Sequence, residues 1–322
     1  MKKIRVVLTA LFLCFLFLAA SCAGGGSYTV GICQQSPHKA LDAASAGFRD
    51  ALTAELGEGN VTFLLQDAHG ESTSCTSIVN YFVSQRVDLI LANATTALQA
   101  AVNGTVEIPI LGTSVTDYGT VLGMDDFPGI TGTNVSGTSD LTPLDEQAQL
   151  ILTLFPDAKT VGLLYCSAEP NSDYQINGIR QHLEAKGIKC KDFPFFDSNE
   201  IASVAKAAAA ASEVIYIPTD NTAASSAEAI GGAVLHTGTP IIGGDAGICG
   251  SCGIATICVD YYALGEQTAK LAAKILRGEA KIEEMPIEYA AAYQKLYNPE
   301  LCTEYGIDTA KLDDLGYAPM GN

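Results

Sequence analysis

The chain repeats one pattern of apolar segments in its two halves, and this repeat limits its fold more than any other feature. Three segments of the first half recur in the same order in the second half: 30–32, 88–90 and 108–112 correspond to 161–163, 213–215 and 239–243. The first and third pairs are each separated by 131 residues, and the middle pair by 125. Three matches in one order indicate that a whole lobe is duplicated.

Each half alternates short apolar runs with helical patterns. Residues 28–33 are typical of a strand, and residues 40–56 place Leu41, Phe48 and Leu52 on one helical face before Gly57 ends the pattern. Further strands are expected at 61–66, 88–92 and 108–112, and further helices around 75–82 and 96–102. Strands that alternate with helices form a parallel sheet covered on both faces. The sequence therefore predicts an α/β fold of two doubly wound parallel-sheet lobes with a ligand cleft between them.

The repeat also predicts where the chain passes between the lobes. We expect an N-terminal lobe formed by residues 28–139 plus 260–284, and a C-terminal lobe formed by residues 140–259 plus 285–322. A long helix expected at 261–278 follows the last strand of the second half and should return to the first lobe. Two domains of ordinary size suit a mature chain of about 300 residues.

The first 22 residues have the pattern of a signal peptide. A basic start with Lys2, Lys3 and Arg5 precedes an apolar run and a short stretch of small residues that ends at Cys22. Residues 18–22 resemble the lipobox of bacterial lipoproteins, in which the cysteine receives a diacylglycerol, although Ala19 stands where leucine is usual. Residues 23–27 are typical of a flexible tether. We therefore expect an extracytoplasmic protein anchored to the cell membrane through Cys22, with an ordinary signal peptide as the alternative.

The net charge of the chain limits which partners it can bind. Without the three basic residues of the signal segment, the chain retains 15 basic and 36 acidic side chains, a net charge near −21. So acidic a surface argues against nucleic acid and anionic lipid as partners.

Eight cysteines follow Cys22, and Cys33, Cys166 and Cys258 occupy apolar contexts that favour packing as small hydrophobic residues. The pairing of the cysteines stays open.

Polar side chains follow the expected strands in both halves. The carboxyl ends of parallel strands lie along one edge of a sheet, and ligands of such folds bind there. Candidate ligand-binding residues are Gln34, Asn93, Thr95, Thr116, Asp117, Ser167, Glu169, Asn171, Asp220, Asn221, Thr222 and Asp245. Any one of them could instead be a helix cap or turn residue. As a set they place carboxylates on the second lobe and hydroxyls and helix N-termini on the first, a division that suits a zwitterion.

Four segments of the chain resemble a known family. They are 112–117 (GTSVTD), 134–140 (NVSGTSD), 218–222 (PTDNT) and 259–265 (VDYYALG), and they are similar to ABC-type substrate-binding lipoproteins of the tryptophan/tyrosine-uptake type. The likeness runs from about Tyr28 to about Gly278. It implies a type I periplasmic-binding fold with three crossing segments, and an amino acid ligand, aromatic in the better-known members. It also implies delivery of that ligand to an ABC permease and its ATPase.

The sequence departs from this family at two places. Residues 35–39 (QSPHK) replace a segment in which relatives more often place an acidic residue before the histidine. Residues 249–253 (CGSCG) contain a cysteine pair that relatives usually lack. Both segments lie near the expected mouth of the cleft. His38 is the one histidine placed to contact a ligand, with a solvated residue at a helix start as the alternative reading.

No catalytic constellation is visible in the sequence. None of the four histidines stands in a G-x-S-x-G or H-E-x-x-H pattern, and the Cys249–Cys252 pair lacks matched zinc ligands. We therefore expect no enzyme, no metal and no cofactor. A nucleoside- or sugar-binding lipoprotein, or a ligand-sensing receptor domain, of the same fold stays as the alternative. Sugar-binding proteins, however, stack rings on tryptophan, which this chain lacks.

Overall fold

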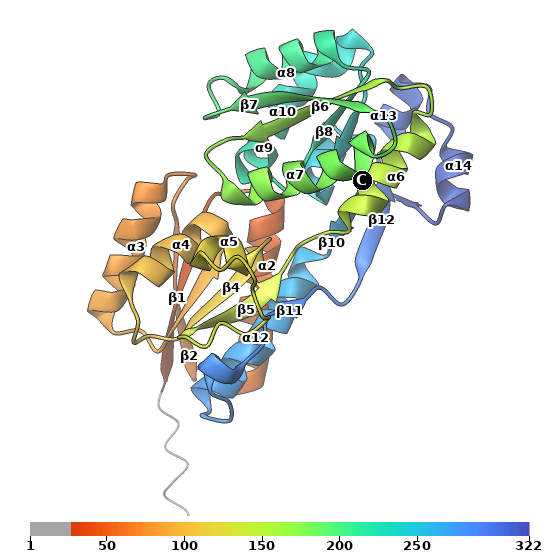
Figure 1. Ribbon diagram of the computed structural model, residues 1–322. Coiled ribbons are helices and arrows are strands. Elements are labelled where there is room, and N and C mark those ends of the chain that lie inside the picture. Colours follow the sequence, from red (N-terminus) through yellow and green to blue (C-terminus); the bar gives the residue numbers. More distant parts are fainter. Residues whose placement is uncertain (1–26, 322) are drawn as a thin grey trace, which may run out of the picture.

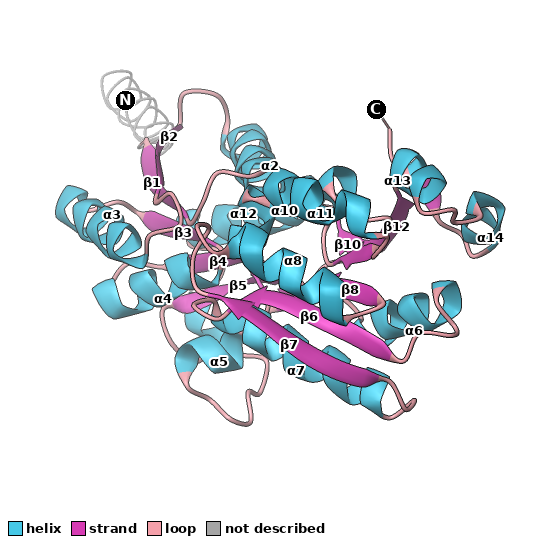
Figure 2. Ribbon diagram, turned by 90° about the horizontal axis from the view of Figure 1, so that it is seen from above, coloured by secondary structure: helices cyan, strands magenta, loops and turns pink. Residues whose placement is uncertain are grey.

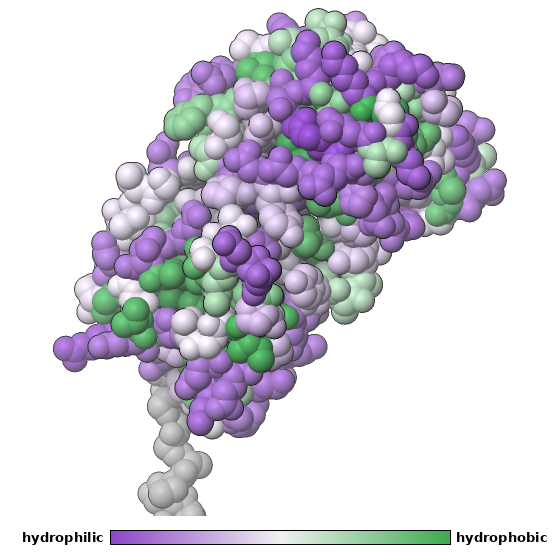
Figure 3. Space-filling view, viewed as in Figure 1, coloured by the Kyte–Doolittle hydropathy of each residue, from purple (hydrophilic) through white to green (hydrophobic). Residues whose placement is uncertain are grey.

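The computed structural model describes residues 27–321, which form two α/β lobes joined by three chain crossings (Figure 1). The predicted signal segment, Cys22 and the tether as far as residue 26 lie outside the described residues. Within residues 27–321, no helix has the length and apolar character needed to cross a membrane. Polar side chains cover much of the face shown in Figure 3, and the lobes meet there along a continuous surface.

The N-terminal lobe is a parallel sheet with helices on both faces. Its elements are β1 (Tyr28–Gln34), α2 (Lys39–Leu56), β2 (Val61–Asp67), α3 (Ser72–Gln85), β3 (Leu89–Asn93), α4 (Thr95–Gly104), β4 (Ile110–Val115), α5 (Tyr118–Leu122), β5 (Val135–Ser139), α12 (Tyr261–Leu276), η2 (Ile282–Glu284) and β11 (Glu288–Tyr289). The strand order is β11-β5-β4-β3-β1-β2. Helix α2 buries Leu41, Phe48 and Leu52, the apolar stripe expected from the sequence. The order reverses between β1 and β3, and such a switch point is where ligands bind in doubly wound folds.

The C-terminal lobe repeats this topology. Its elements are α6 (Leu144–Leu154), β6 (Thr160–Cys166), α7 (Pro170–Glu184), β7 (Lys189–Phe195), α8 (Ile201–Ala211), β8 (Val214–Ile217), α9 (Asn221–Ser225), α10 (Ala227–Val234), η1 (Leu235–Thr237), β9 (Ile241–Gly243), α11 (Ala246–Ser251), β10 (Ala255–Val259), β12 (Tyr293–Tyr297), α13 (Pro299–Glu304), α14 (Thr309–Asp314) and β13 (Ala318–Pro319). The strand order is β13-β12-β10-β9-β8-β6-β7. Its last five strands follow the order β5-β4-β3-β1-β2 of the first lobe, and helices again cover both faces (Figure 2). The predicted two-lobed α/β fold is therefore confirmed.

Two details differ from the sequence prediction. Strand β12 runs antiparallel to β10, because the third crossing brings the chain back along the edge of the second sheet. That crossing comes after β11, which pairs with β5 of the first sheet, so the first lobe continues to Tyr289 and not only to 284. The segment stays with the first lobe because Met285 and Ile287 are buried in its cores.

Helix α12 carries the chain back to the first lobe and packs along α2. Glycines allow the two helix backbones to approach closely. A Cβ at Gly265 would touch the carbonyl oxygen of Ala44 and lie 2.8 Å from the backbone nitrogen of Phe48. A Cβ at Gly47 would likewise lie 2.9 Å from the carbonyl carbon of Tyr262. This close pair of helices fixes the position at which the second crossing enters the lobe.

The eight cysteines of the described residues are free, and all but the half-buried Cys190 are buried. Cys33 and Cys75 belong to one core of the N-terminal lobe, and Cys302 belongs to a core of the other. Burial raises the pKa of the Cys249 thiol and the pKa of the Cys252 thiol. Across residues 27–321, no group of three His, Cys, Asp or Glu side chains is arranged to hold a metal ion. These thiols pack as small apolar side chains.

Candidate ligand site between the lobes

A small cavity lies where the carboxyl ends of the two sheets face each other. Its lining comes from both lobes and from the crossings between them: His38, Leu41, Ser114, Thr116, Asp140, Asn171, Thr219, Asp220, Asn221, Asp245 and Tyr261. The loops after β1, β6 and β8 contribute, so the cavity lies at the switch points of both sheets. Its free volume is about 10 Å³, room for roughly one water molecule. The cleft is therefore closed.

Asp245 follows β9 and offers the cavity a free carboxylate oxygen. Its Oδ1 accepts a hydrogen bond from the backbone N–H of Ile248 at 2.8 Å and caps α11. No hydrogen bond reaches Oδ2 from the described protein atoms, although the residue is only 2% exposed. Burial raises the pKa of Asp245, and the nearby imidazole of His38 opposes that rise. An ammonium group in the cavity would supply the missing donor.

Asp140 lies at the first crossing, directly after β5. Its two oxygens accept hydrogen bonds from the hydroxyls of Thr116 (3.2 Å) and Tyr261 (2.8 Å). Burial raises the pKa of Asp140. Each carboxylate oxygen has two lone pairs and accepts one hydrogen bond from these hydroxyls, so Asp140 can also accept from a ligand.

Asp220 and Glu169 are saturated by protein donors. Asp220 accepts hydrogen bonds from the backbone N–H groups of Cys166 (2.6 Å) and Ala223 (2.8 Å) and from the Ser172 hydroxyl (2.8 Å). Glu169 accepts from the side chains and backbone N–H groups at the start of α9 and from Asn171. The two carboxylates thus hold the loops after β6 and β8 together. Burial, followed by the charge of Glu169, raises the pKa of Asp220 to about 8.

The facing wall carries hydroxyls without partners. The side-chain oxygens of Ser36, Thr95 and Ser114 are buried and have no hydrogen-bond partner in the described structure. Ser36 and Thr95 follow β1 and β3, and Ser114 lies near the end of β4, at the carboxyl edge of the first sheet. Ser114 adopts φ +56°, a left-handed conformation that costs energy for a non-glycine residue. Unpaired buried polar groups are uncommon, so a ligand that bonds them would be stabilised.

The structure brings together five of the twelve residues predicted from the sequence. Thr116, Asn171, Asp220, Asn221 and Asp245 line the cavity. Six others make structural hydrogen bonds near the cavity. Gln34 bonds Asp42, Asp67 and Ser45, and Asn93 bonds Ser45 and the Leu41 carbonyl. Asp117 caps α5, Thr222 and Glu169 bond each other, and the exposed Ser167 bonds the Phe195 carbonyl. Thr95 lies at the same sheet edge without lining the cavity.

Six lining residues were not among the twelve candidates: His38, Leu41, Ser114, Asp140, Thr219 and Tyr261. Of these, His38 was noted separately in the sequence as the histidine placed to contact a ligand. Ser114, Asp140, Thr219 and Tyr261 all stand inside the four segments that carry the family resemblance, so a signal for them was present. Asp140 and Tyr261 were missed because the prediction did not include the ends of β5 and β10, the strands after which the chain crosses to the other lobe.

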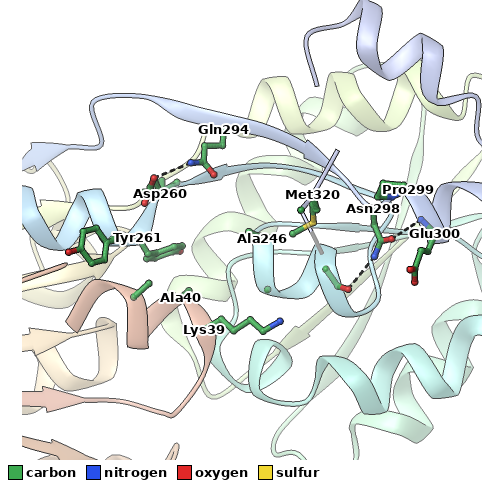
Figure 4. Close-up of a pocket in the computed structure, with 16 residues that line it drawn as sticks. Lys39, Ala40, Ala246, Asp260, Tyr261, Gln294, Asn298, Pro299, Glu300 and Met320 are labelled. Carbon is green, nitrogen blue, oxygen red and sulfur yellow. Dashed lines mark hydrogen bonds between the residues drawn. The ribbon is translucent and has the colours of Figure 1, made fainter. Parts of the chain in front are cut away.

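A larger cavity, of about 490 Å³, opens on the outer side of the lobe junction (Figure 4). Several of its polar groups already bond to one another, since Gln294 donates to Asp260 and Asn298 bonds the Gly250 carbonyl and the Glu300 backbone N–H. Much of the remaining wall is alanine and glycine. The small cavity, with its unpaired oxygens, is therefore the better candidate despite its size.

The buried carboxyls make a pH dependence of stability testable. In the unfolded chain, the pKa of an aspartate is about 3.9, whereas in the fold the pKa of Asp220 is about 8. Between these values the folded protein keeps a proton that the unfolded chain has released, so stability falls as the pH rises. We expect the melting temperature of the ligand-free protein to fall from about pH 5 to about pH 8, and this slope to be smaller in Asp220→Asn. The slope of unfolding free energy is at most about 1.4 kcal/mol per pH unit for one group.

Thermal melts of both proteins across this pH range measure the effect. Asp308→Asn is the matched control, because Asp308 is an exposed helix cap of the same lobe. A wild-type melting temperature that rises over the range, with an equal slope in Asp220→Asn, would contradict the expected protonation.

Comparison with known proteins places this two-lobed chain in one family. The model of the ABC transporter substrate binding protein family matches residues 29–312. The chain belongs to this family. A tyrosine-binding protein of Clostridioides difficile (strain R20291) is 30% identical over 293 residues, covering 89% of this chain and 84% of that protein. The protein is thus an ABC transporter substrate-binding protein.

Two similar solved structures allow the relative placement of the two lobes to be compared. An ABC domain from Streptococcus pneumonia in complex with L-Trp has a TM-score of 0.86 at 26% identity, covering 92% of this chain and 100% of that one. The ligand-free, open structure of a substrate-binding protein with adhesive properties from Clostridium difficile has a TM-score of 0.69 at 31% identity, covering 91% and 100%. The higher score belongs to the less identical chain, so the lobes of this substrate-binding protein are placed more like those of the L-Trp complex.

Proposed function

We propose that this substrate-binding protein captures an amino acid, aromatic in its side chain, between its lobes and delivers it to the permease and ATPase of an ABC importer. The observation that carries this proposal is the pairing of two unlike walls across the closed cleft. One wall offers carboxylate oxygens. The other offers the unpartnered hydroxyl of Ser114, with the unpartnered hydroxyls of Ser36 and Thr95 at the neighbouring strand ends. A zwitterion satisfies both walls at once.

The ammonium group is assigned to Asp245, with Asp140 and Asn171 beside it. Asp245 has a carboxylate oxygen without a protein donor, and the amide oxygen of Asn171 is buried without a partner. Both residues line the cavity together with Asp140. Charged hydrogen bonds of this kind are shorter and stronger than neutral ones. Asp220, another of the carboxylates predicted from the sequence, instead holds the loops that carry this wall.

The carboxylate group is assigned to the first lobe. The Ser114 hydroxyl lines the cavity without a partner, and the Thr95 and Ser36 hydroxyls stand at the neighbouring strand ends. Thr95 is also the first residue of α4, where the helix dipole favours negative charge. No lysine or arginine lines this cavity, so hydroxyl and backbone donors are what the lobe offers an anion.

The proposal that the ligand has an aromatic side chain is based on two relatives. One is named as tyrosine-binding, and the other was solved with L-Trp. The cavity of about 10 Å³ does not admit such a ring, so the lobes must separate for uptake and close less tightly around the ligand. Isothermal titration of the ligand-free protein against the twenty amino acids tests the proposal.

Membrane attachment through Cys22 is part of the same proposal. The segment 18–22 has the lipobox-like pattern, and a substrate-binding protein must stay near its permease. Cys22→Ala is expected to abolish incorporation of a labelled fatty acid and to leave the protein unprocessed or released from the membrane. Unchanged labelling of Cys22→Ala would show that this cysteine is not the lipid anchor.

A further inference from the structure

His38 stands at the start of α2 and reaches across the cleft. It is the N-cap residue of that helix, in extended conformation, but its side chain makes no capping hydrogen bond. Its imidazole Nε2 lies 3.1 Å from the Oδ1 atom of Asn221, at the start of α9 in the other lobe. The side chain is therefore available to join the two lobes.

The neighbours of Asn221 determine the direction of this hydrogen bond. The Asn221 Nδ2 atom donates to the Glu169 carboxylate at 2.7 Å, so its Oδ1 atom is the one that faces His38. An amide oxygen can only accept, and the imidazole therefore donates from Nε2–H. The backbone N–H of Asn221 also bonds Glu169, at 3.1 Å, which holds the acceptor in place.

The donor end is held just as firmly. The His38 carbonyl accepts the first backbone hydrogen bond of α2, from Asp42 at 2.9 Å. The preceding residues are fixed to the sheet edge, because Gln35 accepts from the backbone N–H of Thr96 and Gln34 donates to the Ser36 carbonyl. Since both ends are rigidly mounted, the bond between them depends on how far apart the lobes stand.

This bond is unlike the others between the lobes. Over residues 27–321, every other side-chain hydrogen bond between the lobes involves a residue at one of the three crossings, such as Asp140, Asp260 or Leu141. None of the ion pairs of this region joins the lobes. Opening about the crossings would break the His38–Asn221 bond, because neither residue belongs to a crossing and each is fixed in its own lobe.

His38 also separates the inner cavity from the outside. It lines the small cavity between the lobes, and it lines an outer groove of about 460 Å³ bounded by Pro37, Lys39, Ser226 and Glu228. The same side chain thus contacts both spaces. A ligand leaving the cavity on this side has to pass the His38–Asn221 pair.

We propose that His38 and Asn221 form a latch that closes over the bound ligand and sets how long it stays. The proposal deepens the function proposed above and rests on it. His38 is a positioning residue in this scheme, since it acts through lobe closure. Its loss should speed ligand dissociation and leave association almost unchanged, because the bond forms only after the ligand has entered. One neutral hydrogen bond corresponds to about a three- to ten-fold change in rate.

Stopped-flow fluorescence with L-tryptophan as the probe tests the latch. The chain contains no tryptophan, so the ligand itself gives the signal. His38→Ala is expected to dissociate about three- to ten-fold faster than wild type. His38→Gln, which keeps an N–H donor, should recover part of the difference. His182→Ala removes an exposed histidine of α7 and should match wild type.

The double variant separates a latch from a general structural effect. In an Asn221→Ala background, His38→Ala should cause no further increase in dissociation rate, because the partner is already gone. Equal effects of His38→Ala with and without Asn221 would overturn the latch, as would unchanged dissociation in His38→Ala.

If wild-type protein does not bind L-tryptophan, that result counts against the proposed ligand. The latch is then tested on the ligand-free protein. Spin labels at Thr76 and Lys206, exposed positions on α3 and α8, report the distance between the lobes. His38→Ala should shift the distances of the ligand-free protein towards the open arrangement. Identical distance distributions in wild type and His38→Ala would overturn the latch.

Discussion

Asp245→Asn is expected to bind its best amino acid ligand about ten- to two-hundred-fold more weakly than wild type. The substitution keeps the shape of the side chain and can keep Oδ1 as the cap of α11. It replaces the unpartnered Oδ2 atom with an N–H₂ group, which repels an ammonium group. A hydrogen bond to a charged group contributes about 1.5–3 kcal/mol, and each 1.4 kcal/mol is a factor of ten in affinity.

Isothermal titration of both proteins measures this change. Asp308→Asn is the control, because Asp308 caps α14 through the same kind of bond on an exposed surface. Equal affinities of Asp245→Asn and wild type would remove Asp245 from the ammonium site. Since Asp220 is saturated by protein donors, Asp220→Asn is expected to lower stability as well as binding.

Gly265→Ala is expected to lower the unfolding free energy by about 3 kcal/mol or more. The added Cβ would meet backbone atoms of α2, the Ala44 carbonyl and the Phe48 nitrogen, which cannot rotate away. Overpacking in a well-packed core costs about 1–3 kcal/mol when side chains can adjust, and here the obstacle is the partner helix itself. For domains of this size the melting temperature should fall by roughly 5–10 °C.

Gly232→Ala provides the comparison for this effect. Gly232 lies exposed on α10, and a Cβ there meets nothing within 4 Å. Alanine favours helix over glycine by up to about 1 kcal/mol, so this variant should melt at the wild-type temperature or above. Melting temperatures that fall equally in both variants would contradict close packing of α2 and α12 as the cause.

The duplicated lobe could be predicted from sequence because the repeat and the alternation of elements are local patterns. The two sheets follow the same strand order, as the matched segments indicate. The edge of the second sheet could not be predicted in the same way. Strand β12 lies beyond the repeat and has no counterpart in the first half, so nothing in the pattern gives its antiparallel direction.

The candidate site was predicted to the level of its loops but not of its atoms. A polar residue after a strand can face the cleft, cap the next helix or hold a loop, and composition does not distinguish these roles. Asp245, Asp220 and Asp117 all cap helices, yet only Asp245 and Asp220 line the cavity. The free oxygen of Asp245 depends on which donors surround it in three dimensions, and those come from distant parts of the chain.

Isothermal titration of ligand-free wild-type protein against the twenty amino acids tests the central claim most directly. The two complementary walls of the cleft predict that at least one aromatic amino acid binds with a dissociation constant below about 100 μM, which corresponds to a binding free energy beyond about −5.5 kcal/mol. Absence of heat for all twenty amino acids at this concentration would contradict the claim that the cleft captures an amino acid.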